Sequence, residues 1–380
     1  MTSLRITTVL SPLLLAVASC GGTSTGDRAE AQPREDAAAQ PFALHEAARF
    51  DRPWAMAFAP GTSVLFVTEK AGTLRFLDTA SGRLGTVTGV PAVDYGGQGG
   101  LGDIAFLSSE ASPKLDRRTL LLTWVEAGPD DTRGAVAGRG TLVCAAADSC
   151  RIEGLTVIWR QAPKVTGRGH YSHRLAVSPD SKFLYIASGD RQKMDPAQDP
   201  ASDLGKIIRL PLADPAKATR ISWGHRNILG MAFDGQDRLW EIEHGPAGGD
   251  ELNLVKQGGN YGWPLVSEGK HYDGRTIAPH SSRNDVVAPA ISWNPVIAPG
   301  GMIIYSGNRF PEWRGQVLIG AMKSAALVRV GVERGTGLEL ARYSMERRIR
   351  AITQGPDGSV WLAEDGPDAR LLRLEPRRAQ

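Results

Sequence analysis

The stretch Arg174–Ser188 (RLAVSPDSKFLYIAS) contains two short apolar segments joined by a Pro-Asp turn. Proline fixes the backbone angle φ and Asp accepts a tight turn, so this pattern predicts a β-hairpin. Five other segments, which start roughly 45–75 residues apart, repeat it: Trp54–Val67 (WAMAFAPGTSVLFV), Leu101–Trp124, Leu229–Ile242 (LGMAFDGQDRLWEI), Gly301–Gly320 and Arg350–Ala363 (RAITQGPDGSVWLA). This spacing suits a four-stranded unit with insertions. We predict an all-β fold, a six-bladed β-propeller, in which a strand near Phe42–Phe50 closes the last blade.

The composition agrees with a fold made of short strands. The 44 glycines and 24 prolines exceed a sixth of the 380 residues, against roughly 12% in an average protein. We find no amphipathic helical pattern longer than two turns, which argues against an α/β sheet. The 44 basic and 41 acidic residues leave a net charge of +3 and form no long basic block. A nucleic-acid partner is therefore not expected.

The N-terminus has the pattern of an export signal. In residues 1–20, Arg5 precedes an apolar stretch that ends in Val17-Ala18-Ser19-Cys20, which looks like a bacterial lipobox. An ordinary signal peptide with an incidental cysteine is the alternative. Residues 21–41 hold almost no large apolar side chain and predict a flexible tether before a catalytic domain at 42–380. No Asp follows Cys20, so we expect an outer-membrane lipoprotein that faces the periplasm or the cell surface, held to the membrane only through a lipid anchor at Cys20.

The two remaining cysteines, Cys144 and Cys150, flank a plausible turn. In an exported protein this spacing favours a small-loop disulfide. The chain has no CxxC pair and no His/Cys metal spacing, so a zinc motif is not expected.

Several loops carry residues suited to chemistry. His170 lies on a loop before a strand, where an imidazole can act as a base. Arg226 and Asn227 precede another strand and can grip a planar carboxylate or carbonyl. The segments Glu243–Asn253 and Asn260–Pro264 combine acidic residues with glycines, which suggests a hard cation such as Ca²⁺. Each of these patterns alone also fits an ordinary surface loop.

Scattered residues complete the charge pattern: Gln98, Lys323, Arg348 and Arg350. The two arginines are spaced to point to the same face of a strand. Together with the loops above, they describe a site for a polyanionic ligand held beside Ca²⁺, and a tricarboxylate quinone fits that pattern.

From about Pro53 to Leu374 the chain resembles the soluble PQQ-dependent aldose sugar dehydrogenases, relatives of soluble quinoprotein glucose dehydrogenase. Nine ordered motifs carry the resemblance: GGQGGLGDIAF, GHYSHRLAVSPD, ASGDR, DLGKIIRL, WGHRNILGMAFD, EHGPAGGDELNLV, GGNYGWP, APGGMIIYSGNRFPEW and RIRAITQGPDG. The resemblance implies oxidation of an aldose at C1 to an aldonolactone, with PQQ and Ca²⁺ as cofactors. The preferred sugar, the electron acceptor and the oligomeric state stay open.

The resemblance also implies a role for each residue. His170 matches the catalytic base, Asp190 would orient its imidazole, and Arg226 would stabilise charge on the quinone. The positions that match PQQ ligands are Gln98, His170, Arg226, Asn227, Lys323, Arg348 and Arg350. The carbonyls of Gly245 and Pro246 match ligands of a catalytic Ca²⁺, and Glu251 with the carbonyl of Tyr261 matches a second, structural calcium site.

The chain departs from the glucose-specialised branch at two positions. Gly169 stands where that branch has an Asp before the catalytic His, which favours a broad sugar specificity. His173 takes a position usually filled by Gly, with no explanation from sequence. Two other functions remain open, a calcium-dependent propeller lactonase or esterase and a non-catalytic surface binding propeller; neither requires the cations Lys323, Arg348 and Arg350 together with His170.

Overall fold

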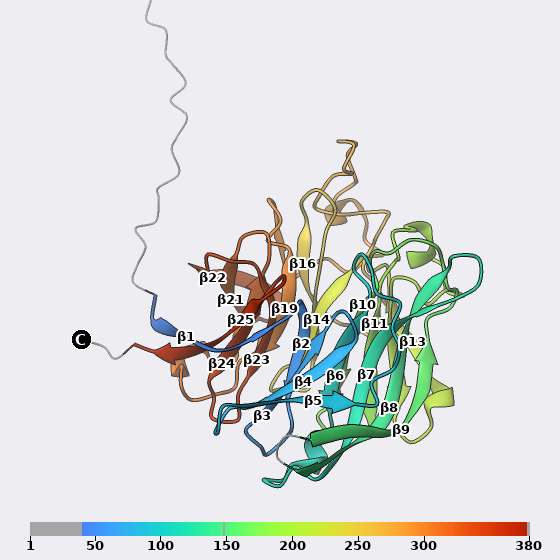
Figure 1. Cartoon of the computed structure of the whole chain (residues 1–380). Helices are drawn as coiled ribbons and strands as arrows, with labels where there is room; N and C mark the ends of the chain where they lie inside the picture. Colours follow the sequence, from blue (N-terminus) through green and yellow to red (C-terminus); the bar gives the residue numbers. More distant parts are fainter. Residues whose placement is uncertain (1–39, 147–148, 378–380) are drawn as a thin grey trace, which may run out of the picture. The chain divides into compact units, whose positions relative to one another are not determined.

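The computed structural model describes residues 40–146 and 149–377, which form strands joined by loops (Figure 1). The helical elements among these residues are 3-10 turns of three residues each. The predicted all-β class is therefore confirmed. The predicted signal segment with Cys20 and nearly all of the predicted tether lie outside the described residues. None of the described helical elements has the length and apolar character that crossing a membrane requires.

The strands follow one another as antiparallel runs of four. The first two runs share one eight-stranded sheet, and the list below gives them in chain order: β2 (Pro53–Phe58), β3 (Val64–Glu69), β4 (Thr73–Asp78), β5 (Arg83–Thr88), then β6 (Leu101–Phe106), β7 (Arg117–Ala127), β8 (Arg133–Ala146) and β9 (Ser149–Arg160). The outer strands β5 and β9 pair in parallel and join the two runs. A disulfide between Cys144 and Cys150 closes the β8–β9 hairpin, as predicted.

Three further sheets each contain one run: β10 (Ser172–Val177), β11 (Phe183–Ser188), β12 (Lys206–Pro211) and β13 (Thr219–Trp223), extended by β17 (Gly259–Asn260); β14 (Ile228–Phe233), β15 (Leu239–Glu243), β16 (Asp250–Leu254) and β18 (Ile291–Trp293); β19 (Pro299–Ile304), β20 (Val317–Ala321), β21 (Ala326–Glu333) and β22 (Thr336–Ser344). The last sheet holds β23 (Ile349–Gln354), β24 (Val360–Glu364), β25 (Ala369–Pro376) and the N-terminal strand β1 (Phe42–Phe50). Strand β1 pairs antiparallel with β25, as predicted for Phe42–Phe50.

The first strands of the runs form a closed ring. Each contacts the next in the order β2, β6, β10, β14, β19, β23 and back to β2. In Figure 1 the ring strands β2, β14 and β19 lie near the middle of the view, while β13 and β22 lie toward its outside. The chain therefore radiates outward within each run and returns to the centre to begin the next.

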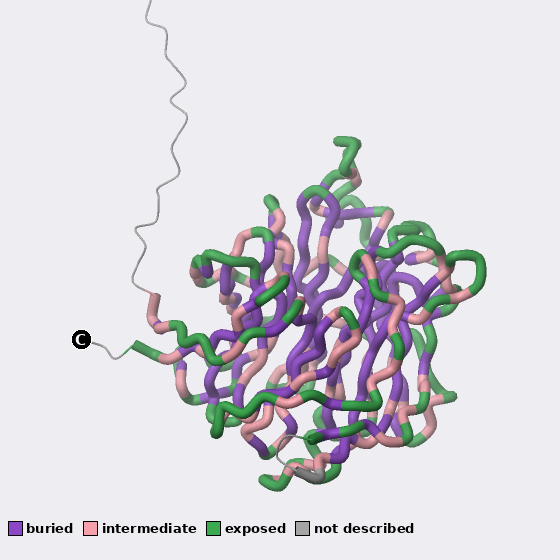
Figure 2. Tube along the Cα trace, in the orientation of Figure 1, coloured by how far each residue is buried: buried purple, intermediate pink, exposed green. Residues whose placement is uncertain are grey.

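Apolar side chains fill the space between neighbouring runs. One hydrophobic cluster lies between each pair of adjacent runs, including the pair that closes the ring, where Leu65 and Val67 pack with Ala351 and Trp361. Figure 2 shows the buried stretches concentrated along the strands and the exposed ones in the loops and outer edges. Burial of these clusters stabilises the radial arrangement by the hydrophobic effect.

Candidate functional site

The predicted site residues gather at one end of the ring. In an antiparallel pair the start of one strand lies beside the end of its partner. The loop that precedes the first strand of each run therefore lies beside the loop that follows the second strand of the same run. Ser172 accordingly pairs with Ser188 and Ile228 with Glu243. Every first strand also has a register shift near this end, and such bulges re-aim side chains. His170, Asp190, Arg226 and Gly245 are brought together in this way.

The centre of the site is a chain of hydrogen bonds through His170. Its Nδ1 lies 2.7 Å from Oδ1 of Asp190, and the indole Nε1 of Trp263 donates to Oδ2 of the same carboxylate at 2.8 Å. The backbone N–H of His170 donates to Oε1 of Gln98 at 2.7 Å. Asp190 is fully buried, so its carboxylate is held on both oxygens away from water.

Burial and charge act in opposite directions on this pair. Burial lowers the pKa of His170, while the hydrogen bond and charge of Asp190 raise it, and the lowering prevails. Burial alone would raise the pKa of Asp190, but the hydrogen bond from His170 and its other partners hold that pKa below its usual value. The pair therefore favours a neutral imidazole beside an ionised carboxylate.

The loop that carries His170 is conformationally strained. His170, Ser172 and His173 have φ values of 48°, 56° and 43°, in the left-handed region that favours glycine. Non-glycine residues in that region cost free energy and gather at functional sites. Here the strain accompanies the contact of His170 with both Gln98 and Asp190.

The loop of Arg226 and Asn227 is held by the buried carboxylate of Glu243. The carboxylate of Glu243 accepts the backbone N–H groups of Arg226 at 2.6 Å and of Asn227 at 3.3 Å. The guanidinium of Arg226 donates to the carbonyl of His244 at 3.0 Å and to the hydroxyl of Tyr272 at 3.2 Å. Its Nε is buried and has no hydrogen-bond partner among the described residues. The guanidinium therefore lines the site with one N–H donor still unsatisfied.

These side chains line a cavity of about 160 Å³. Its lining includes His170, Asp190, Arg226, Pro246 and Trp263, together with His271 and the more exposed Met194 and Tyr272. Polar groups that converge in a concave site of this kind are typical of a ligand pocket.

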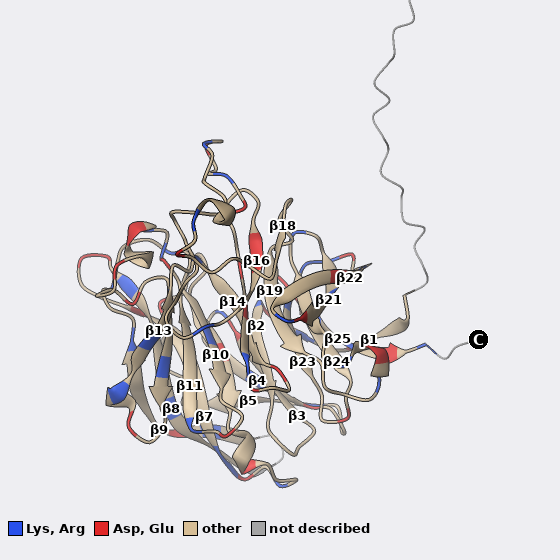
Figure 3. Ribbon diagram, turned by 180° about the vertical axis from the view of Figure 1, so that it is seen from behind, with Lys and Arg blue, Asp and Glu red and all other residues tan. Residues whose placement is uncertain are grey.

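The predicted cations Arg348 and Arg350 share one carboxylate. Asp365 accepts from Nε of Arg348 at 2.8 Å and from Nε of Arg350 at 2.9 Å. Arg350 is buried and its guanidinium lies 4.8 Å from the ring centre of Trp54, whereas Lys323 is exposed. Burial first, and then the charges of Arg226 and Arg350, lower the pKa of His244 to about 3. The charges of Arg226 and Arg350 thus both act on His244, but Lys323, Arg348 and Arg350 are not among the residues that line the cavity of His170. Over the rest of this domain, basic and acidic side chains are interspersed (Figure 3).

The four predicted metal residues line one small cavity. Gly245, Pro246, Glu251 and Tyr261 all contribute to a space of about 10 Å³, which is about the room that a single water or ion requires. Burial, followed by the negative charge of Glu243, raises the pKa of Glu251 well above its usual value. The carbonyl of Tyr261 accepts from Nε2 of His280 at 3.1 Å. A cation here would relieve the cost of the buried carboxylate.

Two residues of the site were not assigned by sequence. Trp263, within the quoted GGNYGWP motif, supports Asp190, and Lys70 lies in the same charged region, where burial and then the charge of Arg350 lower its pKa. Lys70 follows strand β3, and no motif in its surroundings marks it.

The radial all-β fold and the site in its loops are those of a sugar dehydrogenase family. The sequence profile of the Glucose / Sorbosone dehydrogenase family matches residues 50–373. The chain belongs to this family, and the resemblance read from the motifs is confirmed.

Individual relatives agree. The aldose sugar dehydrogenase YliI of Escherichia coli K12 is 33% identical over 348 residues, which cover 87% of this chain and 91% of that protein. The crystal structure of the soluble aldose sugar dehydrogenase of Escherichia coli, in its apo form, superimposes with a TM-score of 0.80 at 31% identity, covering 88% of this chain and 100% of that one. The PQQ-bound aldose sugar dehydrogenase of Streptomyces coelicolor shares the fold, with a TM-score of 0.69 at 23% identity over 88% of this chain and 98% of that one.

Proposed function

We propose that the protein oxidises aldose sugars at C1 to aldonolactones, using PQQ and Ca²⁺, and passes the electrons to an acceptor that the chain does not specify. The observation that carries this proposal is the buried chain from Trp263 through Asp190 to His170 at the wall of the cavity. A neutral imidazole held by an ionised carboxylate is the arrangement of a general base near neutral pH.

His170 acts as the base. Because Nδ1 donates its hydrogen to Asp190, Nε2 carries the free lone pair. Nε2 takes the proton of the anomeric hydroxyl as hydride leaves C1, which turns the C1–O bond into a carbonyl. Asp190 then stabilises the imidazolium that forms.

The residues at the cavity fit PQQ, a planar quinone with three carboxylates. Arg226 offers its guanidinium at the cavity wall, and the exposed Lys323 with Arg348 and Arg350, which do not line the cavity, supply further positive charge. Gln98 and Asn227 supply amide groups beside His170. PQQ held here would supply the two-electron oxidant that takes up the hydride from C1, while His170 takes the proton.

Calcium would be held at two places, one inside the small cavity and one on the side of Pro246 that faces the larger cavity. The carbonyls of Gly245 and Pro246 are oriented by a loop whose Gly245 N–H donates to Asp250 at 2.9 Å, and they would ligate a catalytic ion. Glu251 and the carbonyl of Tyr261 would ligate a structural ion. Oxygen ligands of this type suit a hard cation.

We also propose the architecture and location that this function requires. Counting the eight-stranded sheet as two blades gives a six-bladed propeller, and the closed ring of first strands supports that count. The lipobox at Cys20 supports export and anchoring at the outer membrane, where sugars would be accessible.

Reconstitution of the purified apo protein tests the proposal. With excess Ca²⁺ and PQQ, reduction of a dye should be observed with glucose, xylose, galactose and maltose, and it should require both cofactors. His170→Ala should bind PQQ, seen as a change in its absorbance, but lose nearly all turnover. Parental turnover in that variant would disprove the role of the base. If PQQ does not bind at all, the dehydrogenase assignment is wrong and a lactonase or binding function becomes the better interpretation.

A further inference from the structure

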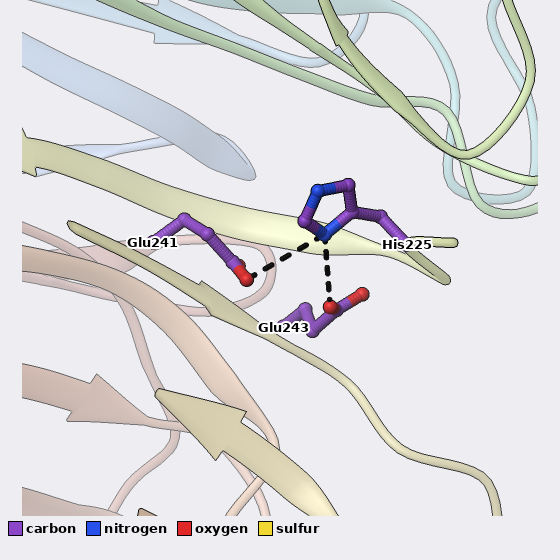
Figure 4. A group of neighbouring side chains, drawn as sticks. All are labelled: His225, Glu241 and Glu243. Atoms are coloured by element: carbon purple, nitrogen blue, oxygen red, sulfur yellow. Dashed lines mark hydrogen bonds and ion pairs between the residues drawn. The ribbon is translucent and has the colours of Figure 1, made fainter. Parts of the chain in front are cut away.

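A second group of polar side chains lies buried beneath the loop of Arg226 and Asn227. Figure 4 shows His225 with Glu241 and Glu243, whose side chains point toward one another. Nδ1 of His225 lies 3.1 Å from Oε1 of Glu243 and 3.6 Å from Oε1 of Glu241. All three side chains are essentially without exposed surface; Glu243 also lines the small cavity assigned above to calcium, whereas His225 and Glu241 do not.

The strand register builds this group. Glu241 and Glu243 are two residues apart on β15 and therefore share one face. On β16, Asn253 pairs with Glu241 and Glu251 pairs with Glu243. His225 reaches the same face from the loop before β14. Three glutamates and a histidine are thereby placed together inside the protein.

The negative charge of this group is poorly compensated. Among the described residues, the ion pairs of Glu241, Glu243 and Glu251 are made with His225 and His280 alone, and no Lys or Arg side chain joins them. Burying carboxylates without a cation is costly, so proteins pair them or use them to bind metal.

Two acceptor atoms beside the group are unused. Oε2 of Glu241 and Oδ1 of Asn253 are buried and lack a hydrogen-bond partner within the described part of the chain. The amide of Asn253 donates to the other oxygen of Glu241 at 2.7 Å, which holds both side chains at the group. Buried acceptors in this state call for a further partner, which an ion or a donor group can provide.

We propose that His225, Glu241 and Glu243 bind a divalent transition-metal ion of the zinc or manganese type, with a structural role. Ligands about 2.0–2.2 Å from such an ion lie roughly 3.3–3.6 Å from one another in a tetrahedral site, close to the separations observed. An imidazole nitrogen among the ligands favours this class of ion over calcium, which takes oxygen ligands.

The surroundings of His225 match those of a metal ligand. With Nδ1 on the ion, Nε2 carries its hydrogen and donates to the hydroxyl of Ser222, which lies 2.8 Å away. The imidazole also stacks on the ring of Tyr261, with ring centres 4.5 Å apart, which fixes its plane.

The ion would support the functional site indirectly. Glu243 uses Oε1 toward His225 and Oε2 toward the backbone N–H groups of Arg226 and Asn227. An ion that holds Glu243 therefore also holds the loop that presents Arg226. No sequence motif marks this site, because His225 lies 16 residues from Glu241 and 18 from Glu243 and only the fold brings them together.

Metal analysis of the full chain tests this proposal without relying on enzyme activity. The protein, saturated with calcium, is incubated with zinc or manganese, passed over a desalting column and analysed by mass spectrometry for metals. Glu241→Gln, which keeps the shape and removes the charge, is compared with Glu312→Gln, an exposed control at a 3-10 turn. Melting temperature is recorded with and without a nitrogen-donor chelator that leaves calcium in place.

We expect one equivalent of transition metal in the parent and in Glu312→Gln, and an at least tenfold lower content in Glu241→Gln. The chelator should lower the melting temperature of the parent by about 5 °C or more, because it removes an ion that stabilises the folded state. It should leave the melting temperature of Glu241→Gln unchanged, because that variant holds no ion to remove. Less than a tenth of an equivalent in the parent, or equal metal in parent and Glu241→Gln, would overturn the proposal. Glu241 would then be a neutral acid paired with Asn253.

Discussion

Nδ1 of His170 lies 2.7 Å from Oδ1 of Asp190, and this carboxylate is fully buried. Its second oxygen accepts the indole N–H of Trp263, so the carboxylate cannot turn away from the imidazole. The bond therefore selects the tautomer of His170 in which Nε2 is free to accept a proton. Asp190 thus fixes the orientation and the tautomer of the base.

Replacing Asp190 by Asn should separate these effects in the reconstituted enzyme. We expect kcat/KM for an aldose to fall about 100-fold or more, because the base loses its fixed orientation and the partner of its imidazolium. Asp190 raises the pKa of His170, so its removal should also move the acidic limb of the pH–rate profile to lower pH. Asp195→Asn, on an exposed 3-10 turn nearby, is the matched control. An unchanged rate and profile in Asp190→Asn would contradict the assignment.

Lys323 offers a test of the anionic cofactor. Its ammonium is exposed and has no ion-pair partner among the described residues, unlike Arg348 and Arg350, which share Asp365. Lys323→Met should weaken PQQ binding about tenfold at low salt, and by less at high salt, because the lost interaction is a screened charge. Titration of PQQ absorbance measures it. Lys217→Met is the control: Lys217 lies on the 3-10 turn after β12, in an exposed ion pair with Asp214, and this variant should bind PQQ normally.

Local sequence patterns were enough to predict the all-β class and most of the hairpins. Pro, Asp and Gly turns between apolar segments marked the hairpins, because turn chemistry and side-chain alternation act over a few residues. The parallel pairing of β5 with β9 was not foreseen, since edge pairing depends on how two complete hairpins pack. The lengths of β8 and β9, 14 and 12 residues, likewise follow from pairing with each other.

The site divided in the same way. His170, Arg226 and Glu251 stand in motifs, but the support of Asp190 by Trp263 spans 73 residues and depends on the meeting of loops from two sheets. Lys70 follows a strand without any recognisable motif, and only the folded structure shows that it lies close enough to Arg350 for their charges to interact. Contacts made by tertiary structure leave no periodic trace in sequence.

The disulfide should stabilise the fold without affecting the site. Cys144 and Cys150 close a small loop at the end of the β8–β9 hairpin, and this end of the ring is opposite to the one that holds His170. Replacing both by Ser should lower the free energy of unfolding by about 2 kcal/mol through the added entropy of the unfolded chain. Denaturant unfolding measures this loss, and kcat with an aldose should stay at the parental value. A large fall in kcat in a folded variant would show that the hairpin communicates with the site.

His173 should make the protein sensitive to acid. It is buried, neither ring nitrogen has a hydrogen-bond partner among the described residues, and burial lowers its pKa from 6.5 to about 3. Between these values the unfolded chain binds the proton and the folded one does not, so stability falls as pH decreases from 6.5 toward 3. His173→Leu removes no hydrogen bond of the ring. Between pH 7 and pH 5 it should lose about 2 kcal/mol less unfolding free energy than the parent, measured by urea denaturation. Equal losses would contradict this origin of acid sensitivity.

Gly102 makes room for the imidazole of His173. A Cβ atom on Gly102 would lie well inside contact distance of Nδ1 of His173 and of Oγ1 of Thr123. Gly102→Ala should therefore destabilise the protein by about 1–3 kcal/mol through overpacking. In a His173→Gly background the same change should cost about 1 kcal/mol less, since the imidazole is gone, while Thr123 keeps part of the penalty. A double-mutant cycle by urea denaturation gives this coupling energy, and strictly additive effects would show that Gly102 is required for some other reason.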